Sequence, residues 1–202
     1  MLWMITDLSR TPGLEKSIGH ISNCLENGAE LLTLRNKGSV PDTFVREIKD
    51  MLDPMFPHKK IFIHDPDEKD MQRYGHFHYP SYRMDEACEI KKQNPSFTVA
   101  VSVHSKAEYE KAFSGGIDLA LLSPVFKPFS KPDDKRDTVA PVSLKNLYLL
   151  GGIDRMKALM LIERGFINIA GISLFYGESS ESVIKELSNL IMEKGYVTAY
   201  SN

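Results

Sequence analysis

The chain has 202 residues, a length that suits one domain with a substantial core. Its 42% hydrophobic and 26% charged residues are ordinary for a soluble globular protein, and its net charge of -2 gives no reason to expect nucleic acid or a membrane as partner. No apolar run approaches the roughly 20 residues of a membrane span, and the first residues lack the pattern of a signal peptide. Cys24 and Cys88 have no metal-ligand spacing, which favours reduced buried thiols and a cytoplasmic protein.

Short apolar runs alternate with helical patterns along the whole chain. The expected strands are 2–5, 29–34, 61–63, 77–79, 97–103, 117–122, 147–150 and 167–172. Helices are expected to begin near Thr11 with Pro12, at Pro41, at Met84, after a capping box of Ser105 and Glu108, after Asp154, and at Ser180. Eight strands alternating with seven or eight helices predict an α/β protein, a single (β/α)8 TIM barrel formed by residues 1–202. A doubly wound open sheet is the alternative, but residues 6–9 do not form the glycine-rich turn that should follow its first strand.

Ligands of such barrels bind at the carboxyl ends of the strands, so the residues just after each strand are candidate site residues. They are Thr6, Asp7, Arg35, Lys37, Asp65, His78, Ser102, His104, Ser123, Lys131, Gly151, Gly152 and Ser173. Arg and Lys neutralise phosphate oxygens, and paired glycines let backbone N–H groups approach a phosphate closely. This set therefore predicts anion binding, with a mobile loop at 127–141 closing over the ligand.

Two other features leave alternatives open. Asp65 follows a buried strand, where it can be a helix cap, a metal ligand, or both. His76 and His78 have no neighbouring cysteine or clear carboxylate, so hydrogen-bonding histidines are favoured over a zinc site. No nucleophile, base and orienting group can be recognised together, which leaves covalent hydrolysis without support.

Eight short motifs in order resemble the thiamine phosphate synthase and TenI-like superfamily, over nearly the whole chain. They are MITD at 4–7, TLRNK at 33–37, IHD at 63–65, FHY at 77–79, VSVHS at 101–105, SPVF at 123–126 followed by SK at 130–131, LGGI at 150–153 and IAGIS at 169–173. Each motif alone is weak, but their shared order indicates membership of the superfamily.

The resemblance implies a synthase that joins an aminopyrimidine diphosphate to a thiazole phosphate and releases diphosphate. Arg35, Lys37 and Lys131 would contact the diphosphate, Ser102 would hydrogen-bond the leaving group, and Asp65 would bind Mg²⁺. Gly152 and the backbone at Ile172 and Ser173 would hold the thiazole phosphate. The candidate substrate-binding positions are Thr33, His64, His78, His104, Ser123, Gly151, Gly152, Ile172 and Ser173. The expected partners are small phosphates and diphosphates, and a homodimer is an open option.

The chain departs from the motifs at several positions. Thr33 replaces a glutamine, His64 an asparagine, Pro128 a threonine and Asn168 a glycine, and Gly75 stands where the family has a second metal-binding aspartate. Pro124 stands where the related thiazole tautomerases have their general acid–base histidine. The alternatives to a synthase are a tautomerase using His64, His78 or His104, and a binding barrel that has lost its chemistry.

Overall fold

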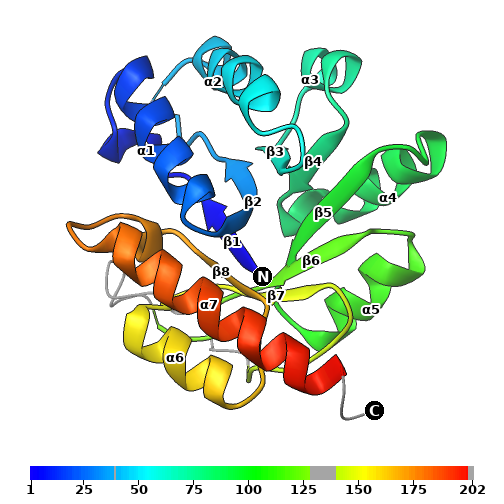
Figure 1. Ribbon diagram of the computed structural model, residues 1–202. Coiled ribbons are helices and arrows are strands. Elements are labelled where there is room, and N and C mark those ends of the chain that lie inside the picture. The colour runs from blue at the N-terminus through cyan, green and yellow to red at the C-terminus, as the bar shows by residue number, and fades with distance from the viewer. Residues whose placement is uncertain (39, 128–139, 200–202) are drawn as a thin grey trace.

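Eight parallel strands form a closed barrel in chain order in the computed structural model, which describes residues 1–38, 40–127 and 140–199, with side chains as far as Lys194 (Figure 1). The strands are β1 (Leu2–Ile5), β2 (Ala29–Leu34), β3 (Lys60–His64), β4 (His76–Tyr79), β5 (Thr98–Val103), β6 (Leu119–Leu122), β7 (Leu147–Leu149) and β8 (Ile169–Gly171). β1 pairs with β2 on one side and with β8 on the other, where Leu2 lies opposite Ile169. This pairing closes the barrel.

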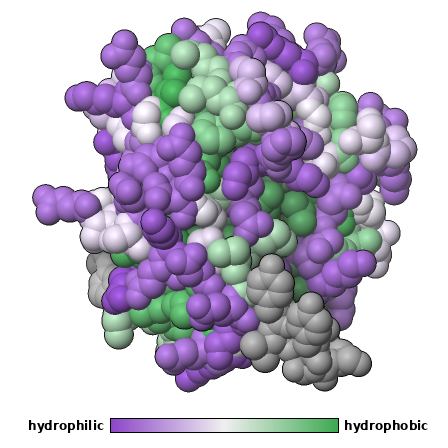
Figure 2. All heavy atoms as spheres, in the orientation of Figure 1, coloured by the Kyte–Doolittle hydropathy of each residue, from purple (hydrophilic) through white to green (hydrophobic). Residues whose placement is uncertain are grey.

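Helices surround the strands as an outer ring (Figure 1). The described residues form α1 (Leu14–Glu26), α2 (Asp42–Met55), α3 (Glu68–Arg73), α4 (Met84–Gln93), α5 (Lys106–Ser114), α6 (Arg155–Glu163) and α7 (Ser180–Ala199), with short 3-10 turns at Leu8–Arg10, Ser81–Arg83 and Ser173–Phe175. The expected (β/α)8 TIM barrel is confirmed. No helix in the described part of the chain is long and apolar enough to cross a bilayer. The face in Figure 2 is mostly hydrophilic, with small hydrophobic patches between polar side chains.

Alternation along each strand divides the buried side chains into two groups, because successive side chains point to opposite faces. The inner group fills the barrel with Trp3, Ile5, Leu31, Phe62, Ala100, Leu121, Tyr148 and Ala170. The larger outer group packs the barrel against its helices. The chain's single tryptophan is therefore fully buried inside the barrel.

The structure differs from the expected helices in two respects. α1 begins after Gly13 instead of Thr11, whose carbonyl oxygen accepts a hydrogen bond of 2.7 Å from Ser17 Oγ. α3 was not expected, although Asp67 and Asp70 form a capping box at its start. Most of the 127–141 loop, with its expected mobility and with Ser130 and Lys131, lies outside the described residues.

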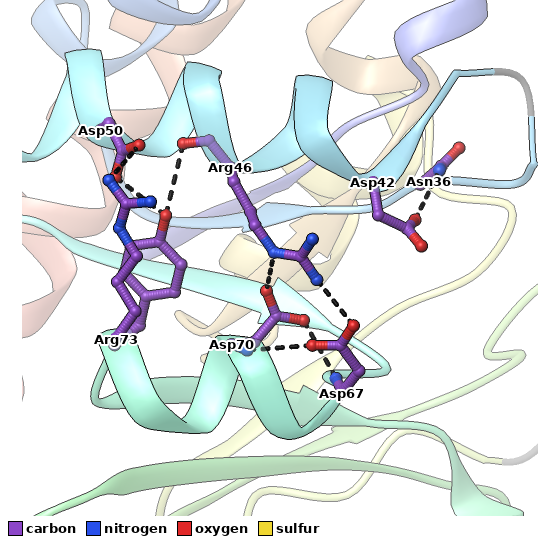
Figure 3. A network of polar contacts seen from close by, with 8 residues as sticks. Asn36, Asp42, Arg46, Asp50, Asp67, Asp70 and Arg73 are labelled. Carbon is purple, nitrogen blue, oxygen red and sulfur yellow. Dashed lines mark hydrogen bonds and ion pairs between the residues drawn. The ribbon is translucent and has the colours of Figure 1, made fainter.

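An arginine joins α2 to α3 (Figure 3). Arg46 of α2 donates to Asp70 Oδ1 and to Asp67 Oδ2, each at 2.7 Å. Arg73 at the end of α3 reaches back to Asp50 of α2, also at 2.7 Å, but that pair is much more exposed. These contacts hold the segment after β3, which carries Asp65, against α2.

Candidate active site at the barrel mouth

The inner rows of β2, β3, β5 and β6 continue into the barrel mouth as polar side chains. Two residues beyond an inward-facing position, the side chain faces inward again. Arg35 thus follows Thr33 of β2, and His64 follows Phe62 of β3. Ser102 and His104 follow Ala100 of β5, and Ser123 follows Leu121 of β6. The fold therefore gathers at one end of the barrel residues that are far apart in the sequence.

Below the mouth, four side chains form a chain of hydrogen bonds across the barrel interior. Trp3 Nε1 donates to Thr33 Oγ1 at 2.9 Å. Thr33 Oγ1 lies 3.2 Å from His78 Nδ1, and His78 Nε2 lies 3.0 Å from Ser102 Oγ. Trp3, Thr33 and His78 are buried, whereas Ser102 is only partly covered. Ser102 is thus the end of this chain that faces the mouth.

Two histidines at the mouth, His64 and His78, are held neutral. Burial, followed by the charge of Arg35, lowers the pKa of His64 to about 4. Burial also lowers the pKa of His78, and His64 and Arg35 add to that effect. The ring centroids of His64 and His78 are 5.1 Å apart. Both pKa shifts involve the charge of Arg35, which agrees with the inward direction of its side chain.

Arg35 is the cation that stands out at the mouth. It is partly buried, and among the described residues no acceptor or carboxylate pairs with its guanidinium group. Its backbone N–H donates to Thr6 Oγ1 at 2.8 Å, which anchors the end of β2 to that of β1. Lys37, in contrast, has its Nζ 3.4 Å from Asp7 Oδ2. The charge of Asp7 acts on Arg35 without an ion pair, and a partly buried guanidinium group without a paired carboxylate is available to an anion.

Asp65 has both carboxylate oxygens occupied by protein donors. Arg83 Nη1 donates to Oδ1, and the Tyr82 hydroxyl donates to Oδ2 at 2.9 Å. Although partial burial works to raise the pKa of Asp65, these hydrogen bonds outweigh it and hold the pKa below its ordinary value. Gly75 brings no carboxylate, and the described residues contain no group of three or more His, Cys, Asp or Glu side chains suited to a metal. The protein groups around Asp65 therefore do not fit a resident Mg²⁺. Magnesium binding at Asp65, which the sequence predicts, stays an untested prediction.

A pocket beside the mouth is also acidic. Asp42, Asp65, Asp67 and Asp70 line it together with His64 and Asn36, between the ends of β2 and β3 and the starts of α2 and α3. Arg46 pairs with Asp67 and Asp70, and Asn36 Nδ2 donates to Asp42 at 3.1 Å (Figure 3). Three of the four carboxylates, those of Asp65, Asp67 and Asp70, are therefore already paired with an arginine.

The loop after β7 approaches the loop after β6 closely. A Cβ on Gly152 would lie 2.5 Å from the carbonyl oxygen of Phe126, and one on Gly151 would lie 2.7 Å from Pro124 Cα. Both glycines have positive φ values, 100° at Gly151 and 64° at Gly152. Among the described residues, neither glycine N–H has an acceptor. The glycines therefore serve the packing of two loops and also leave backbone donors available.

Other predicted site residues have different neighbours. His104 Nδ1 donates to the carbonyl oxygen of Ser123, since a carbonyl oxygen can only accept. This hydrogen bond connects the end of β5 to the end of β6. Ile172 and Ser173 lie at the end of β8, where the 3-10 turn Ser173–Phe175 begins. Lys131 lies outside the described residues.

Sequence reasoning missed Trp3 as a polar group and missed the partners of Asp65. The signal for Trp3 is its inward position on β1, opposite the row that carries Thr33. Tyr82 and Arg83 carry no such signal, because they reach Asp65 from 17 and 18 residues further along the chain.

Comparison with known proteins adds four findings. The family model for thiamine monophosphate synthase matches residues 2–175. A protein of Aquifex aeolicus named "Putative thiamine-phosphate synthase 2" is 36% identical over an alignment of 97 residues. The alignment covers 43% of this chain and only half of the relative's length. A solved thiamine phosphate pyrophosphorylase from Pyrococcus furiosus covers 96% of each chain at a TM-score of 0.70 and 21% identity. A second solved thiamine phosphate pyrophosphorylase, from Bacteroides thetaiotaomicron, matches over 97% of this chain and 98% of its own length. Its TM-score is 0.59 and its sequence identity is 16%. At such identities the solved structures show the fold alone.

Proposed function

The chain belongs to the thiamine monophosphate synthase family, and from this premise we propose that it joins an aminopyrimidine diphosphate to a thiazole phosphate with release of diphosphate. The carbon–oxygen bond to the diphosphate breaks, and its electron pair leaves with the diphosphate. The lone pair of the thiazole nitrogen then forms the new carbon–nitrogen bond. No side chain has to become covalently attached, so the protein contributes charge stabilisation and positioning.

The observation that carries this proposal is the unpaired guanidinium of Arg35 among the described residues at the mouth. Arginine presents a rigid fork of donors that suits two phosphate oxygens. We assign Arg35 and the hydroxyl of Ser102 to the leaving diphosphate. The backbone donors at Gly151 and Gly152, with the start of the turn at Ser173, would hold the thiazole phosphate, in the position usual for phosphates in such barrels. Lys37 and Lys131 remain predicted diphosphate contacts.

The first test is calorimetric titration with the aminopyrimidine diphosphate, together with a product assay after addition of thiazole phosphate. We expect binding and product with the wild type. Arg35→Ala should weaken binding of the diphosphate about tenfold or more, because a hydrogen bond to a charged group is worth about 1.5–3 kcal/mol. Arg73→Ala is the matched control, since that arginine lies at the end of α3 and pairs with Asp50 of α2. Binding of thiazole phosphate without diphosphate affinity or product would refute the synthase.

A second titration tests the magnesium prediction. Asp65→Asn should leave any effect of Mg²⁺ on diphosphate binding unchanged, because the Asp65 oxygens already accept from Arg83 and Tyr82. If the variant loses the magnesium effect while diphosphate still binds, Asp65 ligates the metal as the sequence predicts. A cytoplasmic location and a homodimer complete the proposal, and size measurement in solution tests the second.

A further inference from the structure

We propose that Trp3, Thr33 and His78 form a directional hydrogen-bond relay that fixes Ser102 as a donor toward the ligand. Thr33 and His78 would thus be positioning residues, acting through Ser102. The relay rests on the four side chains joined across the barrel interior, with donor–acceptor distances of 2.9, 3.2 and 3.0 Å. Its effect on the diphosphate rests on the proposed function, whereas its direction does not.

The direction follows from the donors that each group has. The indole N–H of Trp3 can only donate, so Thr33 Oγ1 accepts there. A neutral His78 carries its proton on either Nε2 or Nδ1. If the proton is on Nε2, Thr33 donates to Nδ1, Nε2–H donates to Ser102, and every buried donor in the relay has an acceptor.

The other tautomer leaves a buried donor without a partner. With the proton on Nδ1, Thr33 Oγ1 would accept hydrogen bonds from both Trp3 Nε1 and His78 Nδ1. The hydroxyl proton of Thr33 would then have no acceptor among the described residues. Thr33 is fully buried, so water cannot satisfy it, and such an orphaned donor is destabilising. The hydroxyl proton of Thr33 therefore decides the tautomer of His78, because the His78 Nδ1 atom is its acceptor among the described residues.

His78 is neutral in this setting because its surroundings offer no compensating charge. Its two ring nitrogens meet only hydroxyl groups, and the rings of Trp3 and His64 pack against it at centroid distances of 5.8 and 5.1 Å. Arg35 adds a positive charge nearby. The lowered pKa of His78 agrees with this picture.

The consequence appears at Ser102. Since Ser102 Oγ accepts from His78 Nε2, its own proton is free to point into the mouth. An ionised diphosphate oxygen can only accept hydrogen bonds, so it needs this donor. In the opposite tautomer, Ser102 would donate to His78 and present only lone pairs to the anion. The relay therefore determines whether the serine attracts or repels the leaving group.

The experiment has two independent readouts on the intact protein. Long-range ¹H–¹⁵N NMR of the free protein identifies the protonated nitrogen of His78, with assignment from the signal missing in His78→Gln. Calorimetry with inorganic diphosphate as probe measures binding in Thr33→Val, Trp3→Phe and Ser102→Ala. Thr33→Ser is the matched control, because it keeps the hydroxyl group.

We expect the Nε2–H tautomer in the wild type and in Thr33→Ser. Ser102→Ala removes a hydrogen bond to a charged group and should weaken diphosphate binding about tenfold. Thr33→Val removes the donor to His78 Nδ1 that holds the Nε2–H tautomer, so it should weaken diphosphate binding by at most the same factor. Trp3→Phe leaves the hydroxyl proton of Thr33 with the same need for an acceptor, so this variant should keep the Nε2–H tautomer. An Nδ1–H tautomer in the wild type, or equal diphosphate affinity in Thr33→Val and Thr33→Ser, would overturn the relay. If the wild type binds no diphosphate, the proposed function fails, and the NMR result still decides the relay's direction.

Discussion

At the scale of single residues, the barrel mouth combines an unpaired cation with neutral histidines. Arg35 is kept in its half-buried place by the bond between its backbone and Thr6. Its charge and the surrounding burial together disfavour a second positive charge on His64. Among the described residues at the ends of the strands, Arg35 is thus a cation without a paired carboxylate, and its guanidinium group does not titrate near neutral pH.

The neutral state of His64 lowers the free energy of unfolding at low pH. The pKa of His64 falls from an ordinary 6.5 in the unfolded chain to about 4 in the folded protein. Between these values the unfolded chain binds more protons, so the stability that is present above about pH 6.5 is lost as pH falls toward about 4. We expect the free energy of unfolding, measured by urea titration, to decrease over this range. His64→Gln should reduce the slope, and the exposed His58→Gln should not. Equal slopes in all three proteins would contradict the neutral state of His64.

The sequence showed the type of most site residues but not their contacts. Arg35, His64, Ser102 and His104 were found because each ends a predicted strand. The pairing of Asp65 with Arg83 depends on where the chain after β4 passes over the end of β3, and no local pattern encodes that distance.

At the scale of elements, the ion pairs of Arg46 connect α2 to the start of α3. Its partner Asp70 has a side chain only 8% exposed, so removing Arg46 leaves a buried carboxylate without its cation. We expect Arg46→Ala to lower the free energy of unfolding by about 1–3 kcal/mol. Arg73→Ala is the control, because its side chain is 57% exposed and such pairs contribute less than about 1 kcal/mol. Urea unfolding of both variants is the measurement, and equal losses would argue against the link.

The contact between the β6 and β7 loops makes a second prediction. Gly152→Ala places a Cβ against the carbonyl oxygens of Phe126 and Lys127, at 2.5 and 2.8 Å. Gly165→Ala has a similar positive φ of 87° but nothing within 4 Å of the new atom. The difference in unfolding free energy between the two variants therefore isolates the close approach of the loops. We expect Gly152→Ala to be the less stable by about 1–3 kcal/mol. A difference near zero would show that the loops separate easily.

The predicted strands were confirmed: β1 and β2 have the expected bounds, and the other strands differ by one or two residues at one or both ends. The strand expected at 117–122 begins only at Leu119, because Asp118 uses its backbone N–H and carboxylate to bond Val99 at the edge of the barrel. α3 was missed because six residues are too few to show a helical period. Its capping box was the available signal.

At the scale of the whole molecule, the single tryptophan reports on barrel closure. Trp3 packs on Phe62 of β3 and Tyr148 of β7, at centroid distances of 5.0 and 4.9 Å, so its fluorescence senses both halves of the barrel. If residues 1–202 form one domain, as the sequence predicts, fluorescence and far-UV circular dichroism should show the same unfolding midpoint in urea. Separate midpoints would reveal independently unfolding parts.

The pairing of β1 with β8 also bears on synthesis. Leu2 to Met4 are translated 167 residues before one of their two neighbouring strands, Ile169 to Gly171. Until then the nascent chain carries an unpaired strand edge on β1 and another on its most recent strand, and such edges invite association with other chains. Translation speed and holding chaperones therefore become part of how this barrel reaches its folded state, and short-lived truncated products are its most aggregation-prone forms.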